Sequence, residues 1–431
     1  MRAPGAATQE GLEVDETGTD ATTSGGETFH LEADFLHAPG LVALLDALEG
    51  VGAARVVGGA VRNALLGEPV ADVDVATEAP PDVVAGAATR AGLAVHETGL
   101  EHGTLTIVAA GTPHEVTTLR EDVSTDGRRA TVRFTTDWAK DAQRRDFTMN
   151  ALYLGRDGKG LDPVGGRSDC LARRVRFIGD PDARILEDHL RILRLFRFHA
   201  IYGEGALDVD GLAAARRHKA RLATLAVERI RHELLRILPA HGATAVLSLI
   251  GEEGFLDFVL PGPFDARAVG TLAAAEASIG RTLTPALGLS ALVGFDEDAT
   301  ARGADALKLS RRDRARALAA LVAARAMPPR SAAQTNALLY EHGAEAFVDG
   351  LTIALAWGVI LEDHERLVAT ARRWHRPRLP VTGGDLLRQG GAPGPELGAR
   401  LAHLEALWKA SDFSLDAPRL LAIDREAGHD R

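Results

Sequence analysis

The pattern of apolar residues changes character near residue 180, and this change constrains the fold more than any other feature of the sequence. Before it, short strand-like runs mix with helical stretches, and the runs HGTLTIVAAG and PHEVTTLR alternate as in a β-hairpin. After it, long segments rich in Ala, Leu and Arg follow the 3.6-residue period of helices. The sequence therefore predicts an α+β N-terminal region followed by an all-α C-terminal region.

The 431 residues are too many for one core, since domains average about 150 residues. Two to four domains are expected. Pro and Gly clusters interrupt the helical part near residues 240 and 376. We therefore expect a disordered acidic tail at 1–28, a mixed region at 29–180, and three helical regions at 181–240, 241–375 and 376–431.

Composition excludes several classes of protein. With 46% apolar and 25% charged residues the chain can bury a core, which rules out general disorder. Its single cysteine excludes an intrachain disulfide and a multi-cysteine zinc site, and points to a reducing compartment. The sequence has no apolar run of about 18 residues, and its N-terminus does not resemble a signal peptide. A cytoplasmic protein with no membrane partner is expected.

Charge is distributed unevenly along the chain. The net charge is −11, and the first 34 residues hold eight acids against one arginine. Residues 140–236 instead hold 20 Lys and Arg against 14 Asp and Glu. An anionic partner is therefore expected to bind the middle of the chain.

The segment VVGGAVRNALLGEPVADVDVAT carries the sharpest chemical signal. Gly58-Gly59 follows an apolar strand, Arg62 comes three residues later, and Asp72 and Asp74 follow. Carboxylates at i and i+2 of a strand point the same way and can share the divalent cations that oxygen ligands bind. The glycines allow close approach to a triphosphate, and arginine can neutralise it. Either part alone is usually a turn or a solvated pair, but together they indicate nucleotidyl transfer.

Three further segments follow in order: RRDFTMNALYL at 144–154, DPDARILEDHLRILRLFRF at 180–198 and ERIRHELLRIL at 228–238. With the glycine and aspartate motif, they make the chain resemble the class II tRNA nucleotidyltransferase and poly(A) polymerase family over about residues 50–240. The resemblance implies a polymerase-β-like nucleotidyltransferase head at 29–180, a neck at 181–240 that recognises the base, a body at 241–375, and a tail at 376–431 that binds tRNA.

The resemblance also implies roles for individual residues of the head. Asp72 and Asp74 would bind Mg²⁺ and carry catalysis, while Gly59, Arg62 and Arg145 would bind the nucleotide. The family commonly has Asp where this chain has Asn63, which weakens the expected charge network around Arg62. A third carboxylate is expected on a neighbouring strand, and Glu115 is the candidate; the alternative is an ordinary exposed strand acid.

The neck motif has two interpretations. Glu187 and Arg191 are four residues apart, the spacing of a helix-surface salt bridge. In the family, however, the Asp and Arg of EDxxR bind the Watson–Crick edge of the incoming base, which implies Asp188 and Arg191. An acceptor-only carboxylate would pair with the amino group of cytosine or adenine and reject uracil and guanine.

Other neck residues follow from helix geometry. On one straight helix of 3.6 residues per turn, Arg194 and Arg197 rotate progressively away from Asp188. One straight helix therefore cannot aim all of these residues at one base, and the resemblance implies that Arg194 and Arg197 contact triphosphate or ribose. The apolar Leu190, Leu193, Phe196 and Phe198 are expected in the core.

The resemblance implies an enzyme that adds CMP, CMP and AMP from CTP and ATP to the tRNA 3′ end, without a nucleic-acid template and by two-metal phosphoryl transfer. Its partner is the 3′ end and acceptor stem of tRNA. Alternatives within the family are CC-adding and A-adding enzymes and bacterial poly(A) polymerases. A non-catalytic RNA-binding protein is disfavoured because such a protein has no need of paired metal ligands.

Two further interpretations concern other segments. Residues 121–129 are polar and contain glycine, and the family has a mobile loop here that helps switch from CTP to ATP. Deleting them is expected to leave CC addition and abolish terminal A addition. A second, phosphohydrolase site is not expected, because Asp363-His364 and His342 do not supply the required set of His and Asp residues.

Overall fold

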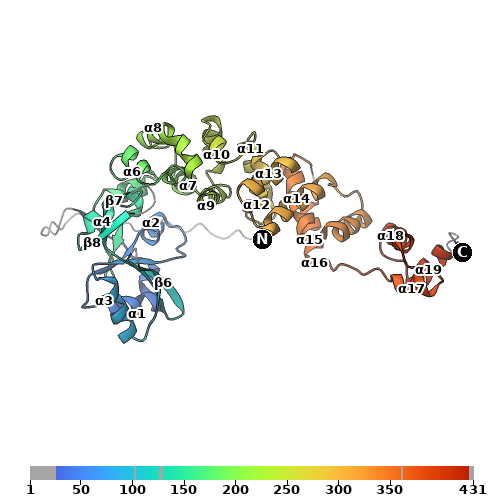
Figure 1. The fold of residues 1–431 in the computed structure, drawn as a ribbon, viewed down its shortest axis with the longest axis horizontal. Coiled ribbons are helices and arrows are strands. Elements are labelled where there is room, and N and C mark those ends of the chain that lie inside the picture. The colour runs from blue at the N-terminus through green and yellow to red at the C-terminus, as the bar shows by residue number, and fades with distance from the viewer. Residues whose placement is uncertain (1–25, 101–102, 126–129, 361–362, 427–431) are drawn as a thin grey trace, which may run out of the picture. The chain divides into compact units, whose positions relative to one another are not determined.

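The computed structural model describes residues 26–100, 103–125, 130–360 and 363–426 (Figure 1). The chain divides into two units, residues 1–124 with 131–170, and residues 125–130 with 171–431. The first unit contains a β-sheet with helices, and the second consists of helices along nearly its whole length. The predicted α+β head followed by an all-α region is confirmed.

The first unit is built on an eight-stranded sheet with the order β1-β10-β9-β2-β3-β6-β5-β4. Its strands are β1 Glu27–His30, β2 Ala54–Val57, β3 Asp74–Thr77, β4 Ala94–Gly99, β5 Thr104–Ala109, β6 Thr112–Thr118, β9 Tyr153–Leu154 and β10 Lys159–Asp162. The expected hairpin is present as β5 and β6, which pair antiparallel. Strand β1 begins at Glu27, inside the 1–28 range expected to be a tail, and residues 1–25 of that range lie outside the described residues.

The central strands set the geometry of the aspartate motif. Strand β3 pairs antiparallel with β2, with Val57 opposite Asp74. On its other side β3 runs parallel to β6, with Val75 level with Val116. After its exposed first residue the strand is buried, with the apolar Val75 and Ala76 followed by Thr77, whose hydroxyl donates to the Ala53 carbonyl at 3.0 Å.

The helices of the first unit are α1 Pro39–Leu48, α2 Gly59–Leu66, α3 Pro81–Arg90, α4 Trp138–Gln143 and α5 Gly166–Leu171. Helices α1 and α3 contact each other and strand β5, so they cover the same part of one sheet face (Figure 1). Proline at the first turn of each supplies a helical φ where no donor is needed. Leu41, Leu44 and Leu48 form the buried stripe of α1.

Residues 121–129 differ from the expected loop. Strands β7 Arg120–Thr125 and β8 Ala130–Phe134 form a separate two-stranded sheet, so part of the segment is regular structure. Both strands contain Val and Thr, β-branched residues that are common in strands. Residues 126–129 lie outside the described residues.

The second unit contains helices α6 Pro181–Glu187, α7 Arg191–Tyr202, α8 Val209–His218, α9 Val227–Ile237, α10 Ala243–Glu252, α11 Ala266–Ser278, α12 Pro285–Leu292, α13 Glu297–Ala306, α14 Arg311–Arg325, α15 Ala332–Ala356, α16 His364–Arg373, α17 Gly383–Arg388, α18 Pro395–Ala410 and α19 Ala417–Glu426. The expected boundaries near 240 and 376 fall between helices, before α10 and after α16. Short 3-10 turns lie at Asp34–His37 and Thr148–Asn150 in the first unit, and at Lys219–Thr224 and Leu256–Phe258 in the second.

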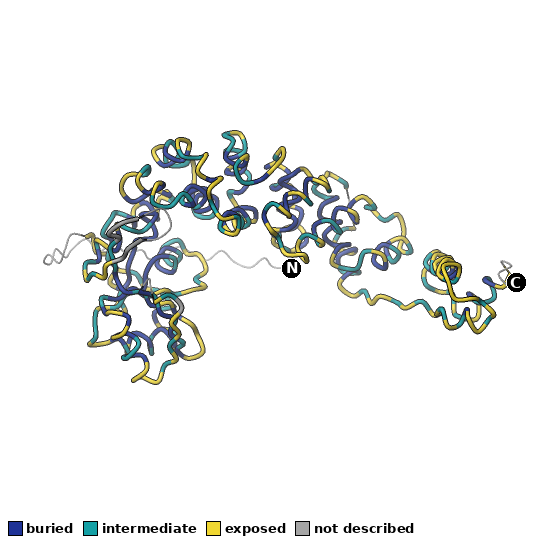
Figure 2. Tube along the Cα trace, viewed as in Figure 1, coloured by how far each residue is buried: buried dark blue, intermediate teal, exposed yellow. Residues whose placement is uncertain are grey.

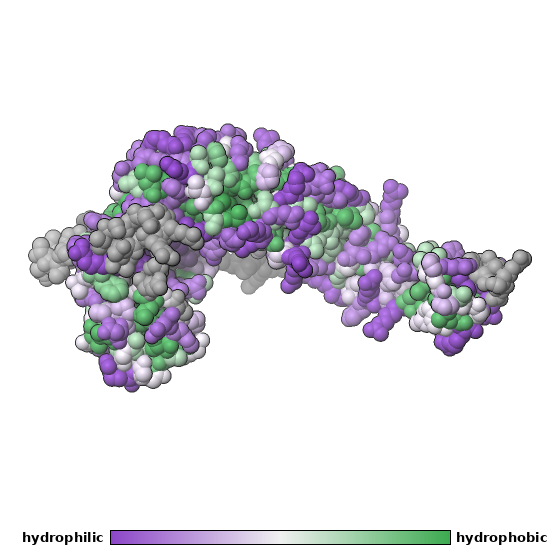
Figure 3. Space-filling view, viewed as in Figure 1, coloured by the Kyte–Doolittle hydropathy of each residue, from purple (hydrophilic) through white to green (hydrophobic). Residues whose placement is uncertain are grey.

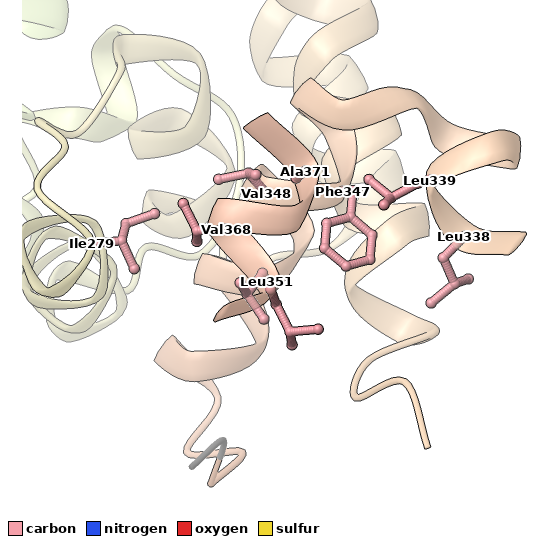
Figure 4. Close-up of a cluster of buried hydrophobic side chains, with 9 residues drawn as sticks. Ile279, Leu338, Leu339, Phe347, Val348, Leu351, Val368 and Ala371 are labelled. Carbon is pink, nitrogen blue, oxygen red and sulfur yellow. The ribbon is translucent and has the colours of Figure 1, made fainter. Parts of the chain in front are cut away.

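Buried residues recur along one side of most helices (Figure 2). One apolar cluster joins α15 and α16 around Phe347, Leu351 and Val368, with Ile279 from the end of α11 (Figure 4). Another gathers α17, α18 and α19 around Trp408. Helical periodicity thus predicts these cores directly.

Hydrophilic residues occupy much of the face shown in Figure 3, with smaller apolar areas among them. Across the described residues, every helix is too short or too polar to span a bilayer. The residues predicted as core in the neck, Leu190, Leu193, Phe196 and Phe198, are all buried.

Candidate active site

The glycine motif forms a tight turn from strand β2 into helix α2. Gly58 has φ +72° and ψ −117°, a conformation that L side chains rarely adopt. Gly59 is the first residue of α2, so the N–H groups of that first turn have no partners within the helix. Such a turn can accept phosphate oxygens because backbone donors and the helix dipole both favour anions.

The two aspartates lie at the start of β3. Asp74 is the first residue of the strand, whereas Asp72 precedes it in an irregular segment. The expectation that both belong to the strand is therefore corrected. The side chains of both aspartates are exposed. Glu115 lies on β6 immediately before Val116, which places it level with Asp74 on the adjacent strand.

The carboxylates influence one another electrostatically. Partial desolvation, followed by the charges of Glu115 and Asp72, raises the pKa of Asp74 to about 6. The positive charges of Arg145 and His114 oppose this rise. A group of like charges with a raised pKa is typical of a site that binds a cation or a proton.

The donor set fits Mg²⁺ bound together with substrate. Asp72 and Asp74 supply hard oxygen ligands, which magnesium prefers. In the part of the chain that the structure describes, no three His, Cys, Asp or Glu side chains converge as a complete metal site. Mg²⁺ is commonly held by one or two carboxylates, substrate phosphates and water, so an incomplete protein set is compatible with it. A ligand role for Glu115 stays a prediction.

Arg62 is buried beside the glycine turn, with 6% of its surface exposed. Its Nη1 donates to Asn150 Oδ1 at 2.5 Å, and its Nε and Nη2 donate to Asn63 Oδ1 at 3.1 and 2.9 Å. Asn63 thus occupies the place of the family's aspartate as an acceptor for Arg62. Its amide also donates to the Pro69 carbonyl at 2.7 Å, a bond that an ionised aspartate cannot make.

Arg145 links the glycine turn to the aspartates. A Cβ added at Gly58 would lie 3.9 Å from Arg145 Nη1, and the charge of Arg145 acts on Asp74. Asp141 and the Tyr153 hydroxyl hold its guanidinium. Burial opposes ionisation of Asp141, but Arg145, Arg144 and the Tyr153 hydroxyl outweigh it and lower the pKa of Asp141 to about 2.

In the second unit the neck motif is not one continuous helix. Helix α6 ends at Glu187 and α7 begins at Arg191, with Asp188 in extended backbone between them. The Asp188 carboxylate accepts from the Leu190 N–H at 3.1 Å and from Arg229 Nη2 at 2.7 Å. The straight-helix expectation is therefore wrong, because Asp188 is in extended backbone and its side chain accepts the Leu190 N–H in the turn before α7.

Within the described part of the chain, the Arg191 side chain is placed by partners other than Asp188. It forms an ion pair with Glu187 and donates to the Arg184 carbonyl at 2.8 Å. The salt bridge expected from the i, i+4 spacing is therefore present. Asp188 and Arg191 nevertheless lie at the two ends of one short connection between helices, so their proposed base-reading role stays a prediction.

Arg194 and Arg197 both approach Glu233 of α9. Arg194 Nη1 lies 4.0 Å from Glu233 Oε1, and Arg197 forms a buried ion pair with the other carboxylate oxygen. Their guanidinium groups also lie over the Phe198 ring, at 5.3 and 4.6 Å from its centroid. Arg194 is the more accessible of the two, so it is the better placed for a phosphate contact.

Sequence reasoning missed three supporting residues. Asp141 precedes Arg145 by four residues, a helical spacing that could have indicated the pair. Arg229 and Glu233 contact residues at least 36 positions away, so local spacing gave no signal for them. Cys170 is buried, and its sulfur lies 3.8 Å from the Arg62 carbonyl oxygen.

Two protein families match parts of the chain. The family described as the Poly A polymerase head domain matches residues 54–176. A second family, described as the probable RNA and SrmB-binding site of polymerase A, matches residues 207–266. The first match contains Gly59, Asp72, Asp74 and Arg145.

Curated relatives extend the similarity over most of the chain. The mitochondrial CCA tRNA nucleotidyltransferase 1 of Danio rerio is 36% identical over 379 residues, covering 85% of this chain and 86% of the relative. The CCA-adding enzyme of Levilactobacillus brevis is 32% identical, with 86% and 92% covered. The crystal structure of the Bacillus stearothermophilus CCA-adding enzyme in complex with CTP is 30% identical with a TM-score of 0.76, covering 90% of this chain and 96% of that chain.

Proposed function

Because the chain belongs to the CCA-adding tRNA nucleotidyltransferase family, we propose that it adds CMP, CMP and AMP from CTP and ATP to the 3′ end of tRNA, with Asp72 and Asp74 as its catalytic carboxylates. The observation that carries these residue roles is the placement of two aspartates at the start of β3, where partial burial and the neighbouring carboxylates raise the pKa of Asp74. The glycine turn and Arg145 adjoin the same strand.

The reaction joins the terminal ribose hydroxyl of tRNA to the α-phosphorus of the nucleotide and releases pyrophosphate. Asp72 and Asp74 would hold Mg²⁺, which supplies positive charge to the phosphates and activates the attacking hydroxyl. The turn at Gly58 and Gly59 presents backbone donors to phosphate oxygens. Arg145 is held by Asp141 and Tyr153, so its charge is already oriented before the nucleotide binds.

Base selection is assigned to the connection between α6 and α7. Asp188 has an accessible carboxylate that Arg229 holds in place, and Arg191 is held by Glu187. A fixed acceptor and a fixed donor can read the amino group and ring nitrogen of cytosine or adenine. Each lost bidentate contact with a wrong base costs about 1–3 kcal/mol.

The test is nucleotide addition to a tRNA that lacks CCA. The purified protein should add CMP twice and AMP once, and then stop. Addition of two nucleotides only, of AMP only, or of a long A tail would assign the chain to the CC-adding, A-adding or poly(A) alternatives.

A second measurement separates catalysis from binding. Asp72→Ala should abolish transfer while tRNA affinity is nearly unchanged, whereas Asp82→Asn, on the exposed first turn of α3, should leave both intact. Transfer by Asp72→Ala would reject the assigned carboxylates. Absence of transfer by the parent protein, with tRNA binding retained, would favour a non-catalytic RNA-binding protein.

Mg²⁺ as the physiological ion and the cytoplasm as the compartment are also part of this proposal. Oxygen-only ligands favour Mg²⁺ over softer metals, and one buried cysteine suits a reducing compartment. The Danio rerio relative is named as mitochondrial, so fractionation of the source cells is the appropriate measurement.

A further inference from the structure

His114 contacts the backbone between the two aspartates. It lies on β6 with only 4% of its surface exposed, directly before Glu115. Its Nδ1 lies 3.1 Å from the carbonyl oxygen of Val73. Because a carbonyl oxygen only accepts hydrogen bonds, Nδ1 carries the proton and donates it.

The ring reaches this carbonyl from behind the carboxylates. Side chains alternate along a strand, and in β6 His114 is buried while Glu115 is exposed. Asp72 and Asp74 are exposed like Glu115. The histidine is therefore directed to the core face, and it binds the backbone of the aspartate motif without occupying its ligand side.

The bond acts where the sheet gives little support. Strand β3 begins at Asp74, so Val73 and Asp72 precede the ladder that holds the rest of the strand. The Val73 carbonyl belongs to the peptide plane that joins Val73 to Asp74. Fixing that plane restricts the backbone rotations that orient both carboxylates relative to each other.

Packing keeps the ring in this position. A Cβ added at Gly40 would lie 3.2 Å from His114 Nε2 and 2.7 Å from the Ala109 carbonyl oxygen, so the glycine lets α1 close against the ring. Within the described part of the chain, the buried Nε2 has no hydrogen-bond partner. An apolar side chain would avoid that unpaired atom, so packing alone does not explain a histidine here.

We propose that His114 is a positioning residue, which holds the Val73 peptide so that Asp72 and Asp74 are preorganised to bind a divalent cation. This inference rests on the proposed function, since it assumes that the two aspartates are the metal ligands. A donor that orients metal ligands without touching the metal raises metal affinity. The ligands are already ordered, so they lose less conformational freedom when the cation binds.

The experiment compares His114→Asn with His114→Leu in the full-length protein. Asn and Leu are similar in size, but only Asn can place an N–H near the position of Nδ1. Binding of Mn²⁺ alone is measured by electron paramagnetic resonance, and thermal unfolding is recorded for each variant. Transfer of CMP to tRNA is then measured to separate kcat from KM for CTP.

We expect His114→Leu to bind Mn²⁺ roughly threefold to tenfold more weakly. This loss lies at or below the range for groups that directly support metal ligands. We also expect a lower kcat with little change in KM for CTP. His114→Asn should recover most of both. Thr104→Val is the matched control: it removes the 3.0 Å hydroxyl contact with Thr117 in the same sheet and should leave Mn²⁺ affinity unchanged.

Equal Mn²⁺ affinity in His114→Leu and the parent protein would overturn the inference, as would equal losses in the Leu and Asn variants. If His114→Leu does not fold, His114→Phe and His114→Asn provide the same comparison. Asp72→Ala distinguishes an error in the proposed metal ligands from an error in the role of His114. Mn²⁺ affinity retained by Asp72→Ala rejects the proposed metal ligands, whereas its loss, with His114→Leu unaffected, rejects only the role of His114.

Discussion

Asp141 holds Arg145 through one carboxylate oxygen, with Oδ2 at 3.1 Å from Nε and 2.9 Å from Nη2. The other oxygen, Oδ1, accepts from Arg144 at 2.6 Å. Asp141 is fully buried, and it also accepts from the Tyr153 hydroxyl at 2.8 Å. One carboxylate therefore fixes the arginine that borders the glycine turn and whose charge acts on Asp74.

Replacing Asp141 should destabilise the first unit more than removing any single bond to it. Asp141→Asn leaves two arginines without their buried counter-charge, which costs about 3–5 kcal/mol. Tyr153→Phe removes one hydroxyl and should cost about 1 kcal/mol. Urea denaturation measures both, and equal losses in the two variants would contradict the central role of Asp141.

Asp74 should make stability and metal binding depend on pH. Its folded pKa of about 6 exceeds the ordinary value of 3.8, so the folded state favours the proton. Protonation of Asp74 contributes its full stabilisation of the folded state below about pH 4, and this contribution is lost as pH rises through 6. Without metal, Asp74→Asn should therefore stabilise the protein by about 1 kcal/mol at pH 8, a value discounted for solvent exposure, and by almost nothing at pH 4.

Metal binding supplies the complementary test for Asp74. A cation competes with the proton, so the parent protein should bind Mn²⁺ more tightly as pH rises from 5 to 7. Electron paramagnetic resonance titrations at several pH values measure this dependence. A flat profile would contradict the assigned titration of Asp74.

The two adjacent glycines should respond differently to the same substitution. Gly58→Ala places a side chain at φ +72°, which costs about 1–3 kcal/mol and distorts the turn. Gly59→Ala enters the first turn of α2, where the added Cβ meets only an ordinary contact at 3.6 Å from Arg62 Nη2. Unfolding free energies measure the contrast, and a larger loss at Gly59 would disprove the described turn geometry.

Asp188 should control the choice between CTP and UTP. Asp188→Asn provides an amide donor that the uracil carbonyl can accept, so the ratio of UMP to CMP incorporation should rise about tenfold. Asp182→Asn is the control, because that carboxylate binds Arg217 and His218. Single-nucleotide incorporation assays measure the ratio, and an unchanged ratio in Asp188→Asn would remove Asp188 from base selection.

Glu121 should influence AMP addition more than CMP addition. Its carboxylate binds Arg133 at 2.7 Å and Lys140 at 3.0 Å, and so connects β7 to β8 and to α4. Glu121→Gln weakens these contacts in the segment expected to take part in the switch from CTP to ATP. Time courses on tRNA ending in CC measure AMP addition, and Asp46→Asn, which removes a surface partner of Arg156, is the control.

The sequence by itself determined the elements and the chemistry that depends on neighbouring residues. Apolar periodicity predicted the β5–β6 hairpin and the change to helices near residue 180, because these patterns follow local backbone geometry. The aspartate spacing and the glycine pair indicated nucleotidyl transfer because they too are local features of neighbouring residues. Only the resemblance implied that Asp188 and Arg191 read the base. Spacing alone indicated a surface salt bridge between Glu187 and Arg191.

Only the tertiary structure decided which groups support that chemistry. At the break, the Asp188 side chain accepts the Leu190 N–H in the turn before α7 and binds Arg229 from a distant helix. Parallel pairing of β3 with β6 brings Glu115 level with Asp74 and His114 against Val73. Sequence patterns report which face of an element is apolar, but contacts between distant segments depend on strand order and helix packing, which the local pattern does not contain.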